Sequence, residues 1–157
     1  MLSYAASFVG IPYRWWNPEV SCCDKEGPFY ASLGSEVPME VIQKGHMNCA
    51  GLLNLICRKF GLEIPGAKEE FFYAGGTVCW WDSFKSKGQL QPFDPSLIYP
   101  KGTILLRQYR SEEDQGHIAI VYDRTTIIHS WPEKGVLMEE LDPTYYEAVV
   151  VGFLKNE

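Results

Sequence analysis

The sequence has no run of apolar residues long enough to cross a membrane as a helix, and its first residues lack the basic start and apolar core of a secretion signal. Positive charge is not in excess either: 14 Lys and Arg against 20 Asp and Glu give a formal net charge of −6. Because surfaces that bind nucleic acid or anionic membranes need a basic face, the charge argues against both partners. Without a secretion signal, we expect a cytoplasmic protein.

Cysteine and histidine are both scarce. The chain has three His and five Cys, an odd number that leaves at least one thiol unpaired in a monomer. In a reducing compartment the default is free thiols rather than a disulfide framework. We therefore expect a monomer with free cysteines, in which any His or Cys that carries chemistry is one of a few candidates.

Neither a repeat nor a low-complexity tract divides the 157 residues, so we expect one domain over residues 1–157. Proline and glycine recur between residues 17 and 45. This composition predicts a long irregular segment, and long loops in compact domains are commonly functional. We interpret residues 17–45 as an inserted loop that could wall or cover a cleft.

The clearest predicted helix runs from Cys49 to Phe60, where apolar residues recur at three- and four-residue spacing and form one stripe. Asn48 is a suitable N-cap, and Gly61 stands where a helix end favours a residue that tolerates positive φ. A shorter helix is predicted over Leu2–Val9. Residues 68–99 are rich in aromatic and turn residues and receive no assignment.

The last third of the chain changes character. Short β-prone runs separated by turn residues predict five strands: Thr103–Arg107, His117–Tyr122, Thr126–Ser130, Val136–Glu139 and Ala148–Leu154. A helix followed along the chain by an antiparallel meander predicts an α+β fold.

Cys49 stands at the start of the predicted helix, where free N–H groups and the helix dipole favour an anion. This position predicts a lowered thiol pKa and a nucleophilic thiolate. His117 begins a predicted strand and can serve as the base. His129 lies on the next strand, and facing side chains on antiparallel neighbours are about 5 Å apart, close enough for His129 to orient His117.

Five short blocks resemble, in order, those of the NlpC-type cell-wall cysteine peptidases. Their patterns are Gly-x-Pro-Tyr-x-Trp, Asp-Cys-Ser-Gly-Leu, Pro-Gly-Asp, His-Val-Gly-Ile and a second His block. The matching segments here are Gly10–Trp15, Asn48–Leu52, Tyr99–Ile104, Gly116–Val121 and Ile127–Ser130. The two His blocks are separated by 129 − 117 = 12 residues, the usual spacing in the family.

The resemblance implies a compact papain-like fold, in which the helix that bears the nucleophile packs against an antiparallel sheet. It implies Cys49 as nucleophile, His117 as general base and His129 as third member, with no cofactor. Tyr13 matches a tyrosine whose hydroxyl would help to stabilise the oxyanion. The expected substrate is a peptide or muropeptide, cut between γ-D-glutamate and the diamino acid of a peptidoglycan stem.

Two substitutions depart from the family pattern at positions that contact substrate. Asn48 replaces the Asp before the nucleophile, and Ala50 replaces the Ser after it. In the family, both residues help to bind a free amine. The substitutions at Asn48 and Ala50 therefore put the recognition of a free amine in question. Trp15 is a further candidate to line the substrate groove, whereas core packing is the expected role for most of the Trp15-Trp16 and Trp80-Trp81 pairs.

Three other interpretations stay open. The same fold and site could serve an amidase or acyltransferase with a different substrate, or a binding module without activity. Cys22, Cys23, His46 and Cys49 are ligands that zinc accepts. Adjacent Cys22 and Cys23 lack the usual spacing of two to four residues, so we expect no metal.

Overall fold

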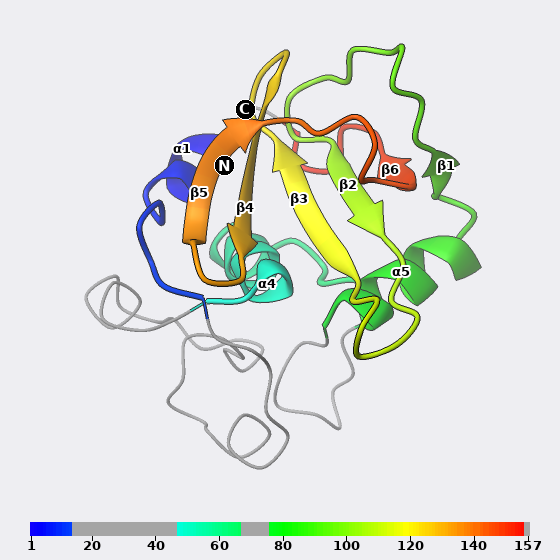
Figure 1. Ribbon diagram of the computed structural model, residues 1–157, viewed down its shortest axis with the longest axis horizontal. Coiled ribbons are helices and arrows are strands. Elements are labelled where there is room, and N and C mark those ends of the chain that lie inside the picture. The colour runs from blue at the N-terminus through cyan, green and yellow to red at the C-terminus, as the bar shows by residue number, and fades with distance from the viewer. Residues whose placement is uncertain (14–46, 67–75, 156–157) are drawn as a thin grey trace.

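A computed structural model of the chain describes residues 1–13, 47–66 and 76–155 (Figure 1). Its helices are α1 (Leu2–Ala6), α4 (Cys49–Lys59) and α5 (Thr77–Ser86). Its strands are β1 (Gln91–Pro92), β2 (Ile104–Arg107), β3 (His117–Val121), β4 (Thr126–Trp131), β5 (Gly135–Glu140) and β6 (Ala148–Val150). Helices precede the main strands along the chain, and the expected α+β class is confirmed. The predicted loop at 17–45 lies wholly outside the described residues.

All strand pairs in the sheet are antiparallel, in the order β1-β6-β2-β3-β4-β5. The predicted meander holds only for β2 to β5. The last strand returns across the sheet and pairs with β2, with Leu105 opposite Val149, and the two-residue β1 extends the sheet beyond it. The meander prediction was wrong for β6 because β-prone composition identifies a strand but carries no information about its partner.

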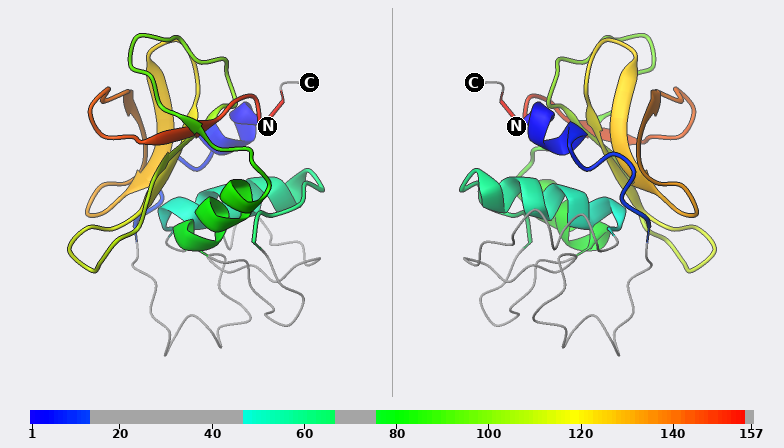
Figure 2. Two further views of the ribbon diagram at one scale, coloured as in Figure 1. Left: turned by 90° about the vertical axis from the view of Figure 1, so that its right-hand side faces the viewer. Right: turned by 90° about the vertical axis from the view of Figure 1, so that its left-hand side faces the viewer.

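Helix α4 begins and ends where local signals placed it. The Asn48 side chain accepts a hydrogen bond from the Gly51 N–H at 2.7 Å, and Gly61 follows the last turn with φ of 65°. Burial is more extensive than the predicted single stripe, because every residue from Cys49 to Cys57 is buried. Figure 2 shows why two sides of α4 are covered: the sheet faces one and α5 runs beside another.

The sheet carries apolar clusters on both faces. The larger cluster joins α4 to strand residues such as Ile118 and Ile120, and the smaller one includes Ala119 and Val121. Successive residues therefore face opposite sides, as a pleated strand requires. The same alternation places His117 on the face of the smaller cluster, which also contains Tyr146.

The N-terminal segment is clamped between β5 and the start of α4. Gly10 and Ile11 exchange backbone hydrogen bonds with Val136, each 2.8 Å long, and the Met47 N–H donates to the Pro12 carbonyl at 2.8 Å. Gly135 permits this approach: its φ is 76°, and a Cβ there would lie 2.2 Å from the Ile11 carbonyl oxygen. The chain just before Tyr13 is thereby held close to the residues that precede Cys49.

Candidate active site

Cys49 is the first residue of α4, and the backbone ahead of it is fixed from two directions. The buried Ser130 hydroxyl donates to the Met47 carbonyl at 2.5 Å, and the Met47 N–H bonds to Pro12. Asn48 then caps the helix through Gly51. Because Ser130 is the neighbour of His129 on β4, this bond ties the start of α4 directly to the strand that carries the second candidate histidine.

The Cys49 thiol is buried against α5 and β3. Its Sγ lies 3.6 Å from the Thr77 hydroxyl, and the backbone of Ile118, the residue after His117, acts to lower the pKa of the thiol. Strands β3 and β4 pair at Ile120–Ile128 and Val121–Ile127, so Ile118 lies towards the unpaired end of the hairpin. The thiol thus meets the backbone of β3 next to the candidate base.

Thr77 is a site residue that the sequence analysis missed. It begins α5, and this helix is fixed to α4 by a buried hydrogen bond of 2.8 Å from the Trp80 indole N–H to the Asn54 side chain. Thr77 also packs beside Gly116, where a Cβ would come within 3.1 Å of its methyl group. The one sign in the sequence of this close approach between Thr77 and residue 116 is that residue 116 is a glycine, which has no side chain.

The two candidate histidines are joined in a chain of hydrogen bonds that ends on a carboxylate. His117 Nε2 and His129 Nδ1 are 2.8 Å apart, and His129 Nε2 lies 2.7 Å from Glu139 Oε1. Both histidines are buried, whereas the Glu139 side chain on β5 is 38% exposed. The predicted juxtaposition of His117 and His129 is present, and Glu139 is an additional partner that the sequence analysis did not identify.

The side-chain hydrogen-bond partner of the Cys49 thiol is Thr77 rather than His117. The His117 ring centre is 5.8 Å from that of Tyr145 and 6.2 Å from that of Tyr146. The Cys49 charge raises the pKa of both tyrosines, after burial as the main cause.

Burial overrides the helix dipole at Cys49. Desolvation raises the pKa of the thiol, and the hydrogen bonds from Thr77, Ile118 and the first backbone N–H groups of α4 only partly oppose it. The predicted lowering of this pKa was therefore wrong in direction, because a buried anion loses more hydration than a few donors replace.

The histidine pKa values move the opposite way for the same reason. Burial holds the pKa of His117 well below its ordinary value of 6.5, with a smaller contribution from the charge of His129. Burial also lowers the pKa of His129, although Glu139 opposes that shift. Burial thus favours the neutral form of the thiol and of both imidazoles.

Aromatic residues enclose the histidine pair. The Trp131 ring centre is 4.9 Å from that of His117 and 5.5 Å from that of His129, and Trp131 also packs edge-on against Tyr145 at 5.4 Å. The sequence analysis did not single out Trp131 or Tyr145. As expected, Trp80 belongs to the core, since it is fully buried.

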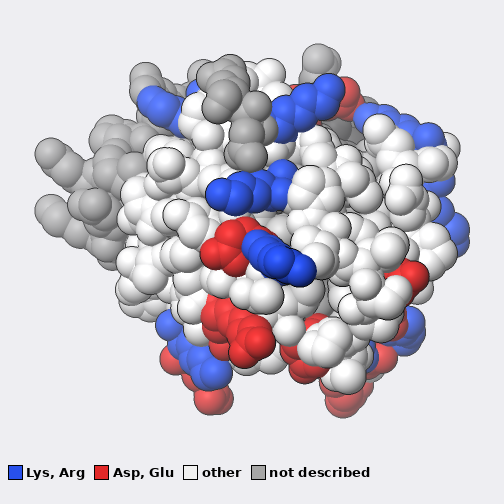
Figure 3. Space-filling model, turned by 90° about the horizontal axis from the view of Figure 1, so that it is seen from above, with Lys and Arg blue, Asp and Glu red and all other residues white. Residues whose placement is uncertain are grey.

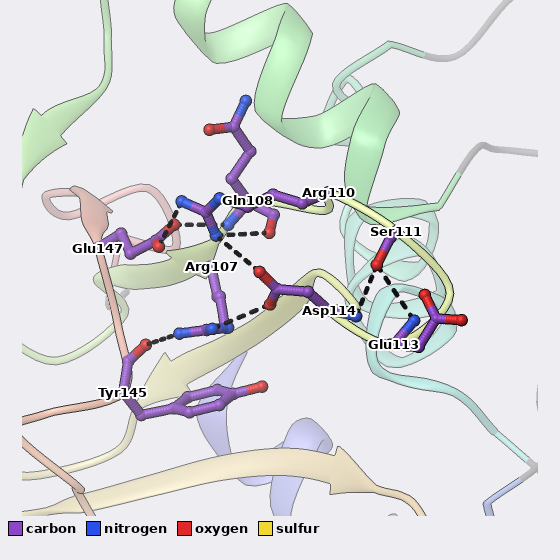
Figure 4. A network of polar contacts seen from close by, with 8 residues as sticks. All are labelled: Arg107, Gln108, Arg110, Ser111, Glu113, Asp114, Tyr145 and Glu147. Carbon is purple, nitrogen blue, oxygen red and sulfur yellow. Dashed lines mark hydrogen bonds and ion pairs between the residues drawn. The ribbon is translucent and has the colours of Figure 1, made fainter.

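An ionic network positions the Tyr145 side of this enclosure (Figure 4). Arg107 is the cross-strand partner of His117. Its guanidinium binds Asp114 at 2.9 Å, donates to the Tyr145 carbonyl at 3.2 Å, and lies 5.0 Å from the Tyr145 ring centre. Arg110 extends the network to Glu147 at 2.6 Å. These contacts hold the loop before β6 against the histidines.

The remaining candidate residues have simpler surroundings. Ala50 and Asn48 are both buried, and the side-chain Oδ1 of Asn48 caps the helix by accepting from the Gly51 N–H. Tyr13 is half-buried at the end of the clamped N-terminal segment. Trp15 lies outside the described residues, so its predicted place in a groove stays a prediction.

Three of the four residues of the zinc alternative lie outside the described part of the chain. Within residues 1–13, 47–66 and 76–155, no group of three or more His, Cys, Asp or Glu could hold a metal ion, while Cys22, Cys23 and His46 lie outside these ranges. Cys49, Cys57 and Cys79 are free thiols. Burial raises the pKa of Cys57 to about 12, which makes it an unreactive core residue.

Two observations bear on membranes and nucleic acids. In the described part of the chain, none of the helices combines the length and hydropathy needed to cross a bilayer. Figure 3 shows acidic and basic side chains interspersed over the face seen from above, so the described atoms there form no continuous basic surface.

Comparison with solved structures gives the fold. The NlpC/p60 domain of the peptidoglycan hydrolase SagA aligns with a TM-score of 0.54 at 19% identity, over 95% of this chain and 93% of that one. RipD from Mycobacterium tuberculosis, a non-catalytic NlpC/p60 protein adapted to peptidoglycan binding, aligns with a TM-score of 0.54 at 13% identity, over 95% and 92%.

A third similar structure belongs to a longer protein. It is a protein similar to a lipoprotein of the NLP/P60 family from Staphylococcus aureus, with a TM-score of 0.51 at 15% identity, over 96% of this chain and 39% of that one. No protein-family model and no curated protein matches the chain.

Proposed function

We propose that this chain, which has an NlpC/p60-type fold, is a cysteine hydrolase that cleaves an amide bond in the stem peptide of peptidoglycan. The observation that carries the proposal is the buried Cys49 thiol at the start of α4, a helix packed against the strands β3 and β4, whose His117 and His129 rings are hydrogen-bonded to each other. A nucleophile, a base and an orienting group in this order are the parts that thiol acyl transfer needs.

The reaction begins from a neutral pair. His117 takes the proton of the Cys49 thiol, and the sulfur attacks the amide carbonyl to form a tetrahedral intermediate. Backbone N–H groups at the start of α4 have no partner within the helix. The Cys49 N–H would stabilise the oxyanion together with the Tyr13 hydroxyl.

The intermediate then collapses. The C–N bond breaks as His117 gives its proton to the leaving amine, and the acyl group stays on Cys49 as a thioester. Water attacks the thioester, with its proton passing to His117, and the carboxylic acid leaves as the thiol is restored. His129 keeps the His117 ring in place throughout.

The bond that we propose is the one between γ-D-glutamate and the diamino acid. The substrate-contacting positions are Asn48, Ala50 and Trp15. Because Asn48 and Ala50 lack the charge and the hydroxyl that the resembling family uses for a free amine, we propose that stems without a free N-terminal amine are accepted. A monomer is part of the same proposal, and size-exclusion chromatography with light scattering tests it.

A second candidate function is a stem-peptide binding module without turnover. The raised pKa of the Cys49 thiol favours it, because a protonated buried thiol is a weak nucleophile. RipD is a structural neighbour that is non-catalytic and binds peptidoglycan.

One experiment separates these functions. The purified chain and its Cys49→Ala variant are incubated with defined muropeptides, with and without a free amine, and the products are identified by mass spectrometry. Cleavage at the γ-D-glutamyl bond that Cys49→Ala abolishes supports the hydrolase. Binding of intact muropeptide without cleavage, measured by calorimetry, supports the module. Full turnover by Cys49→Ala contradicts the proposed nucleophile, and transfer to an added amine or alcohol identifies an acyltransferase.

A further inference from the structure

We propose that Glu139 is a positioning residue that sets the tautomers of both site histidines, so that the Nδ1 atom of His117 is the unprotonated, basic nitrogen. The inference rests on the proposed function for its effect on turnover, but not for its effect on the two rings. It begins from the continuous chain His117 Nε2–His129 Nδ1–His129 Nε2–Glu139 Oε1, with gaps of 2.8 and 2.7 Å.

The direction of each hydrogen bond follows from the end of the chain. A carboxylate accepts hydrogen bonds and donates none, so His129 Nε2 must carry the proton that bonds to Glu139. A neutral imidazole has one N–H, which leaves His129 Nδ1 as an acceptor. The proton in the 2.8 Å bond between the rings therefore belongs to His117 Nε2. His117 Nδ1 is then the only ring nitrogen left with a free lone pair.

Without Glu139, the pair of rings could hold its protons in the reverse order. His129 would then donate from Nδ1, and His117 would accept at Nε2 and carry its proton on Nδ1. In that arrangement no lone pair of His117 is free to take the thiol proton. The bond between the rings is equally good in both directions, so the carboxylate is the element that distinguishes them.

The place of Glu139 suits this task. It lies on β5, which pairs with β4 along six positions from Thr126–Glu140 to Trp131–Gly135, so its backbone is fixed relative to His129. The His129 side chain is 3% exposed, so bulk water has little access to the ring and does not replace Glu139 as the partner of its Nε2 atom. The positive charge of Lys134 lowers the pKa of His129, whereas the Glu139 carboxylate raises it. Glu139 is therefore the group that stabilises a positive charge on His129.

The direct test is ¹⁵N NMR of the protein labelled at its histidine rings, because the ¹⁵N shifts distinguish Nδ1–H from Nε2–H tautomers. Three rings give signals, and a His46→Gln variant identifies the third. We expect both His117 and His129 as Nε2–H tautomers in the unmodified chain. In Glu139→Gln, an amide that can donate as well as accept, we expect a mixture of tautomers at both rings. Nδ1–H at His117 in the unmodified chain overturns the inference.

Turnover provides the second arm. We expect Glu139→Gln to lower kcat by between about tenfold and a thousandfold, with KM nearly unchanged, because general-base catalysis is lost in the wrong tautomer. Glu140→Gln is the matched control, since Glu140 is the exposed neighbour on the other face of β5 and removes the same charge. Unchanged tautomers and unchanged kcat in a folded Glu139→Gln protein overturn the inference.

The NMR and turnover measurements together distinguish a failure of this inference from a failure of the proposed function. If no muropeptide is cleaved but the tautomers shift in Glu139→Gln, the proposed function fails and the role of Glu139 stands. If cleavage proceeds and Glu139→Gln behaves as Glu140→Gln does, the function stands and Glu139 is only a surface carboxylate. Thermal unfolding of each variant separates a lost fold from a lost tautomer.

Discussion

The hydroxyl of Thr77 lies 3.6 Å from the sulfur of Cys49, across the junction between α5 and α4. Among the described residues, Thr77 is the only one whose side chain is hydrogen-bonded to the thiol. Because a hydroxyl can donate to a thiolate, this contact stabilises the charged form of the nucleophile and partly offsets the burial that opposes it.

Thr77→Val removes this donor and keeps the side-chain shape. We expect the thiol pKa to rise further and alkylation by iodoacetamide at neutral pH to slow by between about twofold and tenfold, the net worth of one intramolecular hydrogen bond. Alkylation followed by mass spectrometry gives the rate at Cys49. Ser86→Ala, at the exposed end of the same helix, is the control. An unchanged rate in Thr77→Val would show that the hydroxyl does not act on the thiolate.

The pH dependence of turnover should reveal a neutral resting pair. The pKa of His117 lies well below 6.5 and that of Cys49 lies above 9.0. The active form, neutral at both groups, is lost to protonation of His117 at low pH and to ionisation of Cys49 at high pH. We therefore expect kcat/KM to be flat from pH 6.5 to 9 and to fall on either side. A profile that already declines between pH 7 and 8 would indicate an ion pair with a lowered thiol pKa instead.

The free energy of unfolding should depend on pH through the same two groups, His117 and Cys49. The folded-state pKa of His117 is lowered, so its contribution to the free energy of unfolding is present above 6.5 and is lost as the pH falls towards the folded value. The pKa of Cys49 is raised, so its contribution is present below 9.0 and is lost as the pH rises through the folded value. Urea titrations at several pH values test this. We expect His117→Gln to lose less stability than the unmodified chain on acidification.

The cap at the start of α4 affects stability more than chemistry. Asn48→Ala removes the acceptor of the Gly51 N–H, and loss of an N-cap costs about 1 kcal/mol, a fall in Tm of roughly 2–4 °C for a chain of this size. Asn48→Asp keeps the acceptor and should keep the Tm, as differential scanning calorimetry can check. It also restores the acidic residue of the resembling family, so a gain in activity on stems with a free amine would support the proposed role of this position.

Local signals predicted the parts of the site that depend on neighbours in sequence. The Asn48 cap, Gly61 at the end of α4, and the strands that carry His117 and His129 follow from patterns a few residues long. Thr77 and the pairing of β6 with β2 were missed because they depend on tertiary structure, with α5 fixed to α4 by Trp80 and Asn54. Nothing in the sequence around Glu139 distinguishes it from an exposed strand residue.

The thiol pKa shows a different limit. The dipole at a helix start acts locally, so the sequence predicts its direction. Desolvation depends on how much of the chain covers the sulfur, and this is a property of the assembled core. At Cys49 the second effect is larger and reverses the sign.

The hydrogen bond from Ser130 to the Met47 carbonyl spans 83 residues of sequence. Contacts of such long range close late, because the entropy of a large loop must be lost before they form. During synthesis the nucleophile emerges from the ribosome long before β4, β5 and their histidine–carboxylate chain exist. A fragment that stops before residue 117 would therefore carry the candidate nucleophile but neither of the two histidines proposed to act on it.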